Sequence, residues 1–505
     1  MIKKNIVKNL LVSFLGQLLI IFLGFLLPRI ILMNYGSDTN GLTSTITQIF
    51  TYLALFEAGI GQATKNALFK PLNNNNENEI NEIVTISKKQ FGKVSLIYGV
   101  GVIVLATVFP FILKTNYDYL TIFLIVFFEG LANCVCFYFI NTRSAFLSAV
   151  GKNYIITSID VAVRIFSYGI KIVLAVLKIN IIIIQACFFA ASVLKIMFYY
   201  LYTSKKYSWL KFDADTTIKK LPDKNSYIMT EIAWTIFSST DMIILSIFVS
   251  TALSSVYSVY SMVFVALSGL LNSVYLSVNY LLGQTYHMNI NEYKKIHDMY
   301  NSFFMAIITI LIGTAYILII PFIKMYTTDI NDQEYLYKWL PLLFSIIQLL
   351  SWSRYLPGNL SGIAGYAKIT SIVSLIEASL NVILSIILVF FFEITGVLIA
   401  TVISLPIKVV YLNILSERVI LKRNPIKTIF ILLANFVAFA TLVVINEIFE
   451  ISANIAPNIS SFLIYGIIII SILTVYVFIL NVLANKDMFG ITKLFRKKNN
   501  EQPHN

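Results

Sequence analysis

The feature that most constrains this chain is an apolar stretch that carries three charges on one face. Residues 155–177 are long and apolar enough to cross a bilayer as a helix, yet they include Asp160, Arg164 and Lys171. At about 100° per residue, Arg164 lies about 40° and Lys171 about 20° from Asp160 around the helix. A charge that faces lipid at mid-bilayer costs about 2.5–3.5 kcal/mol. We therefore expect this face to meet protein or a water-filled cavity, unless Asp160 and Arg164 neutralise each other one turn apart.

Composition places the whole chain in a membrane. Of its 505 residues, 58% are hydrophobic and 12% are charged, whereas soluble domains carry about 25% charged residues. This predicts an all-α integral membrane protein with about fourteen transmembrane helices. The first apolar run is too long for the core of a signal peptide, so it is expected to stay as the first span. The predicted spans are residues 10–33, 41–63, 91–113, 120–142, 155–177, 182–203, 227–249, 255–283, 301–323, 339–358, 370–392, 396–414, 428–446 and 462–483.

Basic residues set the predicted orientation. With the N-terminus inside, the inner segments hold 28 of the 38 Lys and Arg residues and the outer loops hold 4. Lys and Arg favour the cytoplasmic side of spans joined by short loops. The sequence therefore predicts a multi-pass protein with both termini in the cytoplasm.

The cysteines and histidines give no sign of a metal site. The three cysteines lie within apolar spans, where a small apolar filler is the expected role. The three histidines, His287, His297 and His504, are assigned to loops or the tail, and their spacing matches no zinc motif. We expect neither a metal nor an organic cofactor.

An internal repeat becomes visible once the spans are placed. One constant offset in residue number aligns Gly41 with Ser255, which both open a polar span, and Gly151 with Gly365 in inner loops. Chance similarity between apolar segments is the alternative. A true repeat predicts two parallel six-helix lobes, an arrangement known in secondary transporters. The predicted domains are an N-terminal lobe at 1–224, a C-terminal lobe at 225–427, and an additional transmembrane helix pair with a basic cytoplasmic tail at 428–505.

Short motifs in the first two spans resemble those of a known transporter family. The motifs are Pro28-Arg29, Tyr35-Gly36, Asn40-Gly41 and Glu57-Ala58-Gly59-Ile60-Gly61. With the span count and the repeat, they are similar to the Wzx-type oligosaccharide flippases of the polysaccharide transporter family, within the multidrug/oligosaccharidyl-lipid/polysaccharide exporter superfamily. This resemblance implies an architecture like that of MATE and MurJ transporters, with a cationic lumen between the lobes. Arg29 and Arg164 best suit that lumen.

The resemblance also implies an activity. Such a flippase moves undecaprenyl-pyrophosphate-linked oligosaccharide repeat units from the inner to the outer leaflet of the bacterial plasma membrane by alternating access. The product would serve O-antigen or capsule synthesis. Expected partners are the lipid-linked substrate, membrane lipids, and a polysaccharide polymerase with chain-length proteins; no nucleic acid and no catalysis are expected.

Cations within the spans are the candidates for binding the pyrophosphate. Arginine offers phosphate a planar fork of donors, and lysine offers a point charge. Arg354 and Lys408 sit near inner ends and could instead extend to the membrane surface. Arg29 follows Pro28 and could form a gate or an interface anchor. The predicted substrate-binding residues are Arg29, Arg164, Lys171, Lys195, Arg354 and Lys408.

Acids within the spans suggest ion coupling. Intramembrane carboxylates in transporters often relay protons or bind sodium. The candidates are Glu57, Asp160, Asp241 and Glu377, and the alternative for each is pairing with a neighbouring cation. No nucleotide-binding fingerprint of the Gly-x-x-x-x-Gly-Lys-Ser/Thr type occurs. We therefore expect transport to be driven by a Na⁺ or H⁺ gradient or by the membrane potential.

Two other functions compete with the flippase. An ion-coupled multidrug or cation antiporter of the same superfamily would favour an acidic lumen and usually twelve spans. A membrane polysaccharide polymerase would need acid and base groups and sizeable outer loops. The predicted outer loops are short, and the acids of residues 324–338 lie in a small solvated loop. The sequence thus favours the flippase over both.

Overall fold

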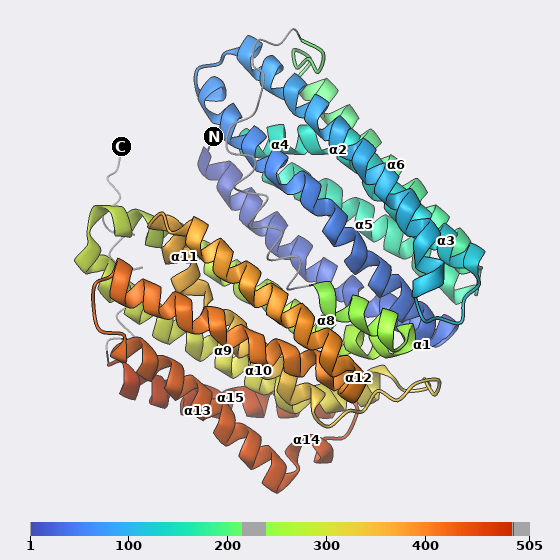
Figure 1. The fold of residues 1–505 in the computed structure, drawn as a ribbon. Coiled ribbons are helices and arrows are strands. Elements are labelled where there is room, and N and C mark those ends of the chain that lie inside the picture. The colour runs from blue at the N-terminus through green and yellow to red at the C-terminus, as the bar shows by residue number, and fades with distance from the viewer. Residues whose placement is uncertain (1, 215–238, 487, 489–505) are drawn as a thin grey trace. The chain divides into compact units, whose positions relative to one another are not determined.

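The computed structural model describes residues 2–214, 239–486 and 488, and in these ranges it is almost entirely helical (Figure 1). The chain divides into two compact units, Met1–Val256 and Tyr257–Asn505. Nine helices in the described part are long and apolar enough to cross a membrane. This confirms the predicted all-α, multi-pass class. The number is smaller than fourteen partly because the two longest helices each cover two predicted spans.

Unit 1 begins with one of these long helices, α1 (Ile2–Asn73). The helix turns at Gly36, where φ is 82° and ψ is 179°. A Cβ disfavours this φ, so glycine lets the chain change direction without a loop. The helices that follow are α2 (Glu77–Ile112), α3 (Tyr119–Phe139), α4 (Asn141–Ala149), α5 (Asn153–Val176) and α6 (Ile181–Lys206), and a shorter apolar helix covers Ser239–Phe248.

Unit 2 contains most of α8 and everything after it. Its longest helix, α12, breaks at Glu393, where φ is 47° and ψ is −125°, and so covers the eleventh and twelfth predicted spans. The helices are α8 (Thr251–Met288), α9 (Ile290–Tyr326), α10 (Leu340–Ser353), α11 (Tyr355–Ile363), α12 (Ala367–Ile414), the π-helical turn η1 (Leu415–Ile420), α13 (Ile426–Phe449), α14 (Ile451–Asn454) and α15 (Ile459–Ala484).

The helix bounds repeat with the offset that the sequence predicts. α4 spans Asn141–Ala149 and α11 spans Tyr355–Ile363, so both ends are displaced by the offset that relates Gly41 to Ser255. The C-terminal ends of α2 and α9 show the same displacement. Gly151 and Gly365, aligned from the sequence, have similar positive φ values of 77° and 84°. A constant offset in bounds and in backbone conformation is not expected by chance, so the internal repeat is confirmed.

Close packing in unit 1 depends on a glycine of α3. Phe50 stacks on Tyr98 with ring centroids 6.1 Å apart, and Tyr98 meets Phe137 edge-on at 4.7 Å. A Cβ at Gly130 would lie 2.6 Å from the Val102 methyl groups and 2.7 Å from Phe50. Only glycine therefore lets α3 approach α1 and α2 this closely.

In unit 2, α13 and α15 pack on α9 through buried polar side chains. Thr309 Oγ1 donates to Asn435 Oδ1 at 2.8 Å, and Asn435 Nδ2 donates to Asn481 Oδ1 at 2.9 Å. Ser302 Oγ donates to the same Asn481 oxygen at 3.4 Å. In an apolar environment such contacts contribute about 0.6–2 kcal/mol each to helix association. The C-terminal helix pair is therefore packed as part of unit 2.

Candidate substrate and ion-coupling site

Three of the predicted site residues meet inside unit 2. Arg354 lies between α10 and α11, and its Nη1 donates to Glu377 Oε1 in the first half of α12. Lys408 Nζ, in the second half of α12, lies 3.9 Å from Glu377 Oε2. The side chains of Arg354 and Glu377 are 6% and 2% exposed, and that of Lys408 is 20% exposed. One buried carboxylate thus faces two cations.

This arrangement shows that the charge of Arg354 is balanced by an acid inside the protein rather than at the membrane surface. The alternative from sequence was that Arg354 extends to the membrane surface, but its guanidinium is buried and turns to Glu377. Buried charges are tolerated when they are paired and hydrogen-bonded. Glu377 cannot neutralise both cations at once, so the group Arg354–Glu377–Lys408 carries one formal positive charge in excess. Such a group can attract an anion.

A smaller pair occupies the corresponding place in unit 1. Lys195 Nζ of α6 lies 3.0 Å from Asp160 Oδ1 of α5, and Tyr199 OH donates to the same oxygen at 3.2 Å. The side chains of Lys195 and Asp160 are 29% and 40% exposed. The alternative that Asp160 and Arg164 neutralise each other is therefore wrong. The spacing along one helix could not reveal that a lysine on the neighbouring helix is closer.

Arg164 is left without such a partner. Its side chain is exposed on α5, and its backbone carbonyl accepts a bond from Ser167 Oγ at 3.2 Å. It forms no ion pair with any residue that the structure describes. Arg164 is therefore the described intramembrane cation of unit 1 whose charge is most available to a ligand.

Lys171 lies further along the same helix in a different setting. Its ammonium lies 3.9 Å from the centroid of the Phe188 ring and is attracted by the Glu129 carboxylate of α3. Glu129 is buried and accepts a bond from Gln185 Nε2 at 2.5 Å. Sequence reasoning did not rank Glu129 or Gln185 as site residues. The signal that could have found them was an acid in one predicted span and an amide in another.

The remaining predicted residues lie in unit 1. Arg29 is half-buried in α1. Asp241 is buried on the helix Ser239–Phe248, beside a contact in which Thr51 Oγ1 and Ser239 Oγ are 2.9 Å apart. The backbone of Glu57 belongs to α1, but its side chain lies outside the described residues. The roles of these three residues as a cation site and as coupling acids stay predictions.

The acid–lysine pairs of the two units follow the repeat. Lys195 and Lys408 are separated by nearly the same offset. Lys195 faces Asp160 on the preceding helix, and Lys408 faces Glu377 in the first half of its own helix. Asp160 aligns with Ser374, one turn before Glu377, so the acid is displaced by a turn between the units. The repeat thus places an acid–lysine contact in each unit, while only unit 2 adds a buried arginine to it.

The histidines require a correction. His287 and His297, expected in loops, lie within α8 and α9. Helix α9 begins well before the apolar run because Asn289 Oδ1 accepts the N–H groups of Asn291 and Glu292 and caps its first turn. The described residues contain no group of three His, Cys, Asp or Glu side chains suited to a metal ion.

Comparison with known proteins gives the fold. No family model and no curated protein matches the chain. It is similar to a structure of an inward-facing multidrug resistance MATE family transporter of the MOP superfamily, with a TM-score of 0.61 and 13% identity over 86% of this chain and 99% of that chain. It is also similar to the lipid II flippase MurJ in an inward closed conformation, with a TM-score of 0.62 and 16% identity over 96% of this chain and 100% of that chain. The chain has a membrane transporter fold.

A third similar structure is a MOP superfamily transporter from Pyrococcus furiosus, with a TM-score of 0.56 and 12% identity over 84% of this chain and 97% of that chain. These structures are those of transporters and a flippase, and this chain shares their all-helical fold. At such low identity the likeness is one of fold. The likeness identifies neither the narrower Wzx-type family nor the substrate.

Proposed function

We propose that this protein is a flippase that moves undecaprenyl-pyrophosphate-linked oligosaccharide repeat units from the inner to the outer leaflet of a bacterial plasma membrane. The observation that carries the proposal is the surplus of cations within the membrane. Among the described residues, Arg164 has no ion pair, and Arg354 and Lys408 share the single carboxylate of Glu377. A pyrophosphate is the part of the substrate that such a surplus would attract.

The chemistry of the group in unit 2 suits reversible binding. A pyrophosphate that approaches Lys408 competes with Glu377 Oε2, which lies 3.9 Å away and so holds the amine weakly. A charge-assisted contact of this kind contributes about 1.5–3 kcal/mol. Protonation of Glu377, or of Asp160 in unit 1, would release further positive charge for the ligand and would couple a proton to the alternating-access cycle. The transport cycle could equally be coupled to a Na⁺ gradient or to the membrane potential instead of to protons.

A multidrug or cation antiporter is the second candidate, and it is supported by the likeness to the MATE transporter structure. An antiporter for cations needs carboxylates that are open to its cargo. Glu377 and Asp160 are instead paired with cations, and Glu129 faces Gln185 and Lys171. The described charges therefore favour an anionic cargo.

A reconstituted assay tests the proposal directly. The purified protein is placed in liposomes that contain a fluorescent, short-chain polyprenyl-pyrophosphate oligosaccharide, and the impermeant reductant dithionite quenches the outer leaflet. We expect the protected fraction of the label to fall when active protein is present. The same oligosaccharide on an uncharged polyprenol should stay protected, because it lacks the pyrophosphate.

The assay also separates the two candidates. The same vesicles are loaded with a cationic dye and given a pH gradient. Dye movement without flipping of the pyrophosphate lipid would overturn the flippase and support the antiporter.

In cells, removal of the gene should cause loss of the surface glycan and accumulation of the lipid-linked repeat unit. Expression of the intact protein should reverse both effects. In that setting the multi-pass protein is expected to reside in the plasma membrane with both termini in the cytoplasm.

A further inference from the structure

A cavity that we call the outer cavity lies at the predicted outer end of unit 2. Its volume of about 420 Å³ falls within the range of about 300–1,000 Å³ that is usual for small-molecule sites. Its walls come from the last part of α9, the connection 327–339, the start of α10, the end of α13 and the short helix α14. The bias of basic residues predicts that this end is outside. No residue proposed above to bind the pyrophosphate lines the cavity, so it is a separate site.

The charged side chains that line the outer cavity balance one another. Among the described residues they are Lys324, Lys338, Glu447 and Glu450. The two lysines disfavour a cation and the two glutamates disfavour an anion, because like charges repel at short distance. The cavity therefore suits an uncharged ligand that both donates and accepts hydrogen bonds.

These charged groups are available to such a ligand. Lys338 Nζ lies 3.2 Å from Glu447 Oε2, but both side chains are exposed, and an exposed pair holds its partners weakly. Lys324 and Glu450 form no ion pair with any residue that the structure describes. An ammonium donates hydrogen bonds and a carboxylate accepts them. Donors and acceptors therefore both line the outer cavity.

Tyrosine side chains add rings and hydroxyl groups to this lining. Asn446 Nδ2 donates to Tyr316 OH at 3.4 Å, so the hydroxyl hydrogen of Tyr316 is left for an acceptor in the cavity. Tyr337 contributes a second ring and hydroxyl from the connection 327–339. A sugar ring has apolar C–H faces and a rim of hydroxyl groups that donate and accept. Aromatic rings and mixed polar groups are the partners that such a ring needs.

Hydrogen bonds hold the walls of the outer cavity in place. Tyr260 OH of α8 donates to the Tyr335 carbonyl at 2.9 Å and accepts from Tyr337 N at 3.4 Å, which fixes the connection before α10. Asn446 Oδ1 accepts from Ser452 N at 3.0 Å and fixes α14 against the end of α13. A site that is formed before its ligand arrives loses less conformational freedom on binding. The outer cavity meets this condition.

The repeat shows that the fold does not require this polar lining. The offset between the two halves aligns Tyr316 with Val102 and Lys324 with Pro110, which are apolar. The connection that follows is longer in unit 2 than in unit 1. The remaining wall, from α13 and α14, lies beyond the two predicted lobes. The outer cavity is therefore a specific addition to unit 2.

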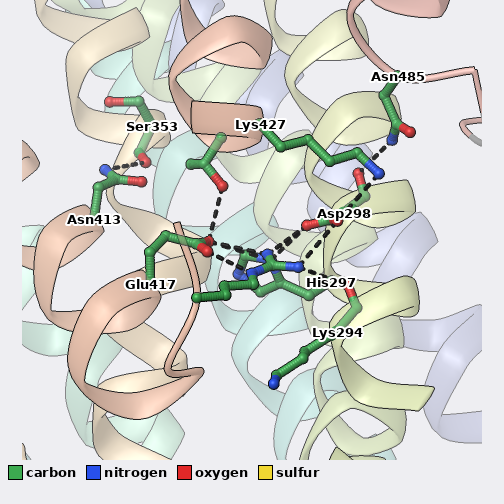
Figure 2. A network of polar contacts seen from close by, with 10 residues as sticks. Lys294, His297, Asp298, Ser353, Asn413, Glu417, Lys427 and Asn485 are labelled. Carbon is green, nitrogen blue, oxygen red and sulfur yellow. Dashed lines mark hydrogen bonds and ion pairs between the residues drawn. The ribbon is translucent and has the colours of Figure 1, made fainter. Parts of the chain in front are cut away.

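The opposite end of α9 carries charges that are paired with one another. Figure 2 shows His297, Asp298 and Glu417 turned toward one another. Arg423 Nε donates to Glu417 Oε2 at 2.5 Å, and its Nη1 donates to Asp298 Oδ2 at 3.0 Å. Lys427 Nζ lies 3.2 Å from the same Asp298 oxygen. These contacts attach α13 to α9, whereas two of the four charges of the outer cavity have no such partner among the described residues.

We propose that the outer cavity binds an uncharged sugar ring, and that this ring belongs to the lipid-linked oligosaccharide once it has reached the outer side. The second part rests on the proposed function, whereas sugar binding itself does not. Lys324 and Tyr316 donate to the sugar hydroxyls, and Glu450 accepts from them. Binding at this end stabilises the state in which the glycan has crossed the membrane, because a ligand favours the state that it binds better.

Saturation-transfer NMR tests the binding of sugar. The full-length protein in lipid nanodiscs is mixed in turn with methyl glucoside, methyl galactoside and methyl N-acetylglucosaminide, and with the anionic methyl glucuronide. We expect transfer to a neutral glycoside and weaker transfer to the glucuronide, which the two glutamates disfavour. Glycerophosphoethanolamine, a lipid headgroup, is the competing probe. Transfer to no neutral glycoside, or to the headgroup alone, would overturn the proposal.

Two variants locate the binding site. Ala453 lines the cavity, so Ala453→Trp should fill it and abolish transfer to the glycoside. Ala456 is also exposed but does not line the cavity, so Ala456→Trp is the matched control and should bind like the parent protein. Glu450→Gln changes an exposed side chain, and loss of its charged acceptor should weaken binding about tenfold. Binding at the parent level in either Ala453→Trp or Glu450→Gln would overturn the proposal.

The dithionite assay separates this inference from the proposed function. If both hold, Ala453→Trp should flip the pyrophosphate lipid more slowly than Ala456→Trp, because the product loses its outer site. A parent protein that binds glycosides but does not flip the lipid would contradict the proposed function and leave sugar binding in place. A parent protein that flips the lipid but binds no glycoside would overturn the inference about the outer cavity alone.

Discussion

Glu377 determines the charge balance of its surroundings because its two oxygens face different cations. Arg354 donates a direct hydrogen bond, while Lys408 lies 3.9 Å away and is partly exposed. Breaking a buried ion pair by removing one partner costs about 3–5 kcal/mol, since the other charge is left buried alone. The two cations should therefore differ in structural importance although they share one acid.

Arg354→Gln should lower the free energy of unfolding by about 3–5 kcal/mol, because Glu377 keeps only a distant amine. Lys408→Gln should cost distinctly less, because Arg354 still pairs with the carboxylate. Thermal unfolding of both variants in the same detergent measures the difference. Equal losses would contradict the geometry, and greater loss in Lys408→Gln would reverse it.

Arg164 differs from Arg354 because its charge forms no ion pair with any described residue. Its side chain is exposed and lacks an ion pair, so Arg164→Ala should change stability by no more than about 0.5 kcal/mol. Binding of a pyrophosphate by Arg164 predicts near loss of flipping in Arg164→Ala and partial activity in Arg164→Lys, which keeps the charge without the fork. The dithionite assay at equal protein abundance measures both. Full activity of Arg164→Ala would remove this residue from the substrate site.

At this scale the sequence could predict which charged residues lie within the spans but not which ones pair. A charge inside an apolar span is conspicuous, and this rule found Arg354, Glu377 and Lys408. Pairing depends on how neighbouring helices are rotated, which one helix does not encode. Asp160 therefore meets Lys195 on α6 rather than Arg164 on its own helix.

At the scale of helices, small residues decide how closely neighbours approach. Gly130 on α3 faces Val102 and Phe50 at distances that leave no room for a methyl group. Gly169 on α5, in contrast, has no atom within 4 Å of the place a Cβ would take. The two positions form a natural pair for comparison, because both are helical glycines in unit 1.

Gly130→Ala should destabilise the protein by about 1–3 kcal/mol, because overpacking forces α3 away from α1 and α2. Gly169→Ala should be neutral or stabilising by up to about 1 kcal/mol, since alanine favours a helix over glycine. Thermal unfolding in detergent compares them. A stable Gly130→Ala protein would show that α3 can shift at little cost.

Hydropathy predicted the apolar helices well, but it missed their polar extensions. The apolar run of α9 begins near residue 301, while the helix begins at Ile290 because Asn289 caps it there. That extension places His297 inside a helix and against Glu417. The sequence contains no local signal that the chain becomes π-helical at η1, where Glu417 accepts bonds from Arg423 and Thr428.

At the scale of the whole chain, the offset between the two halves was predictable because it recurs at widely separated places. It recurs again in the bounds of α4 and α11, which no hydropathy pattern defines. The division into compact units was less accessible, because α8 is continuous across the boundary at Val256 and Tyr257. The lobe boundaries at residues 224 and 427 stay predictions.

The orientation of the chain in the membrane can be tested at two positions. Lys211 follows α6 in a segment rich in lysine, and Asp332 lies in the connection between α9 and α10. Both residues are exposed, so each can be replaced by cysteine in a variant without the native cysteines. The bias of basic residues predicts that position 211 is cytoplasmic and position 332 external.

An impermeant maleimide applied to intact cells should therefore label position 332 and leave position 211 unlabelled. Permeabilised cells provide the control, because both positions should react there once the membrane is open. The same bias of basic residues orients all the spans between the two cysteines. Both positions should therefore label as predicted, or neither should. Labelling at 211 with none at 332 in intact cells would invert the topology.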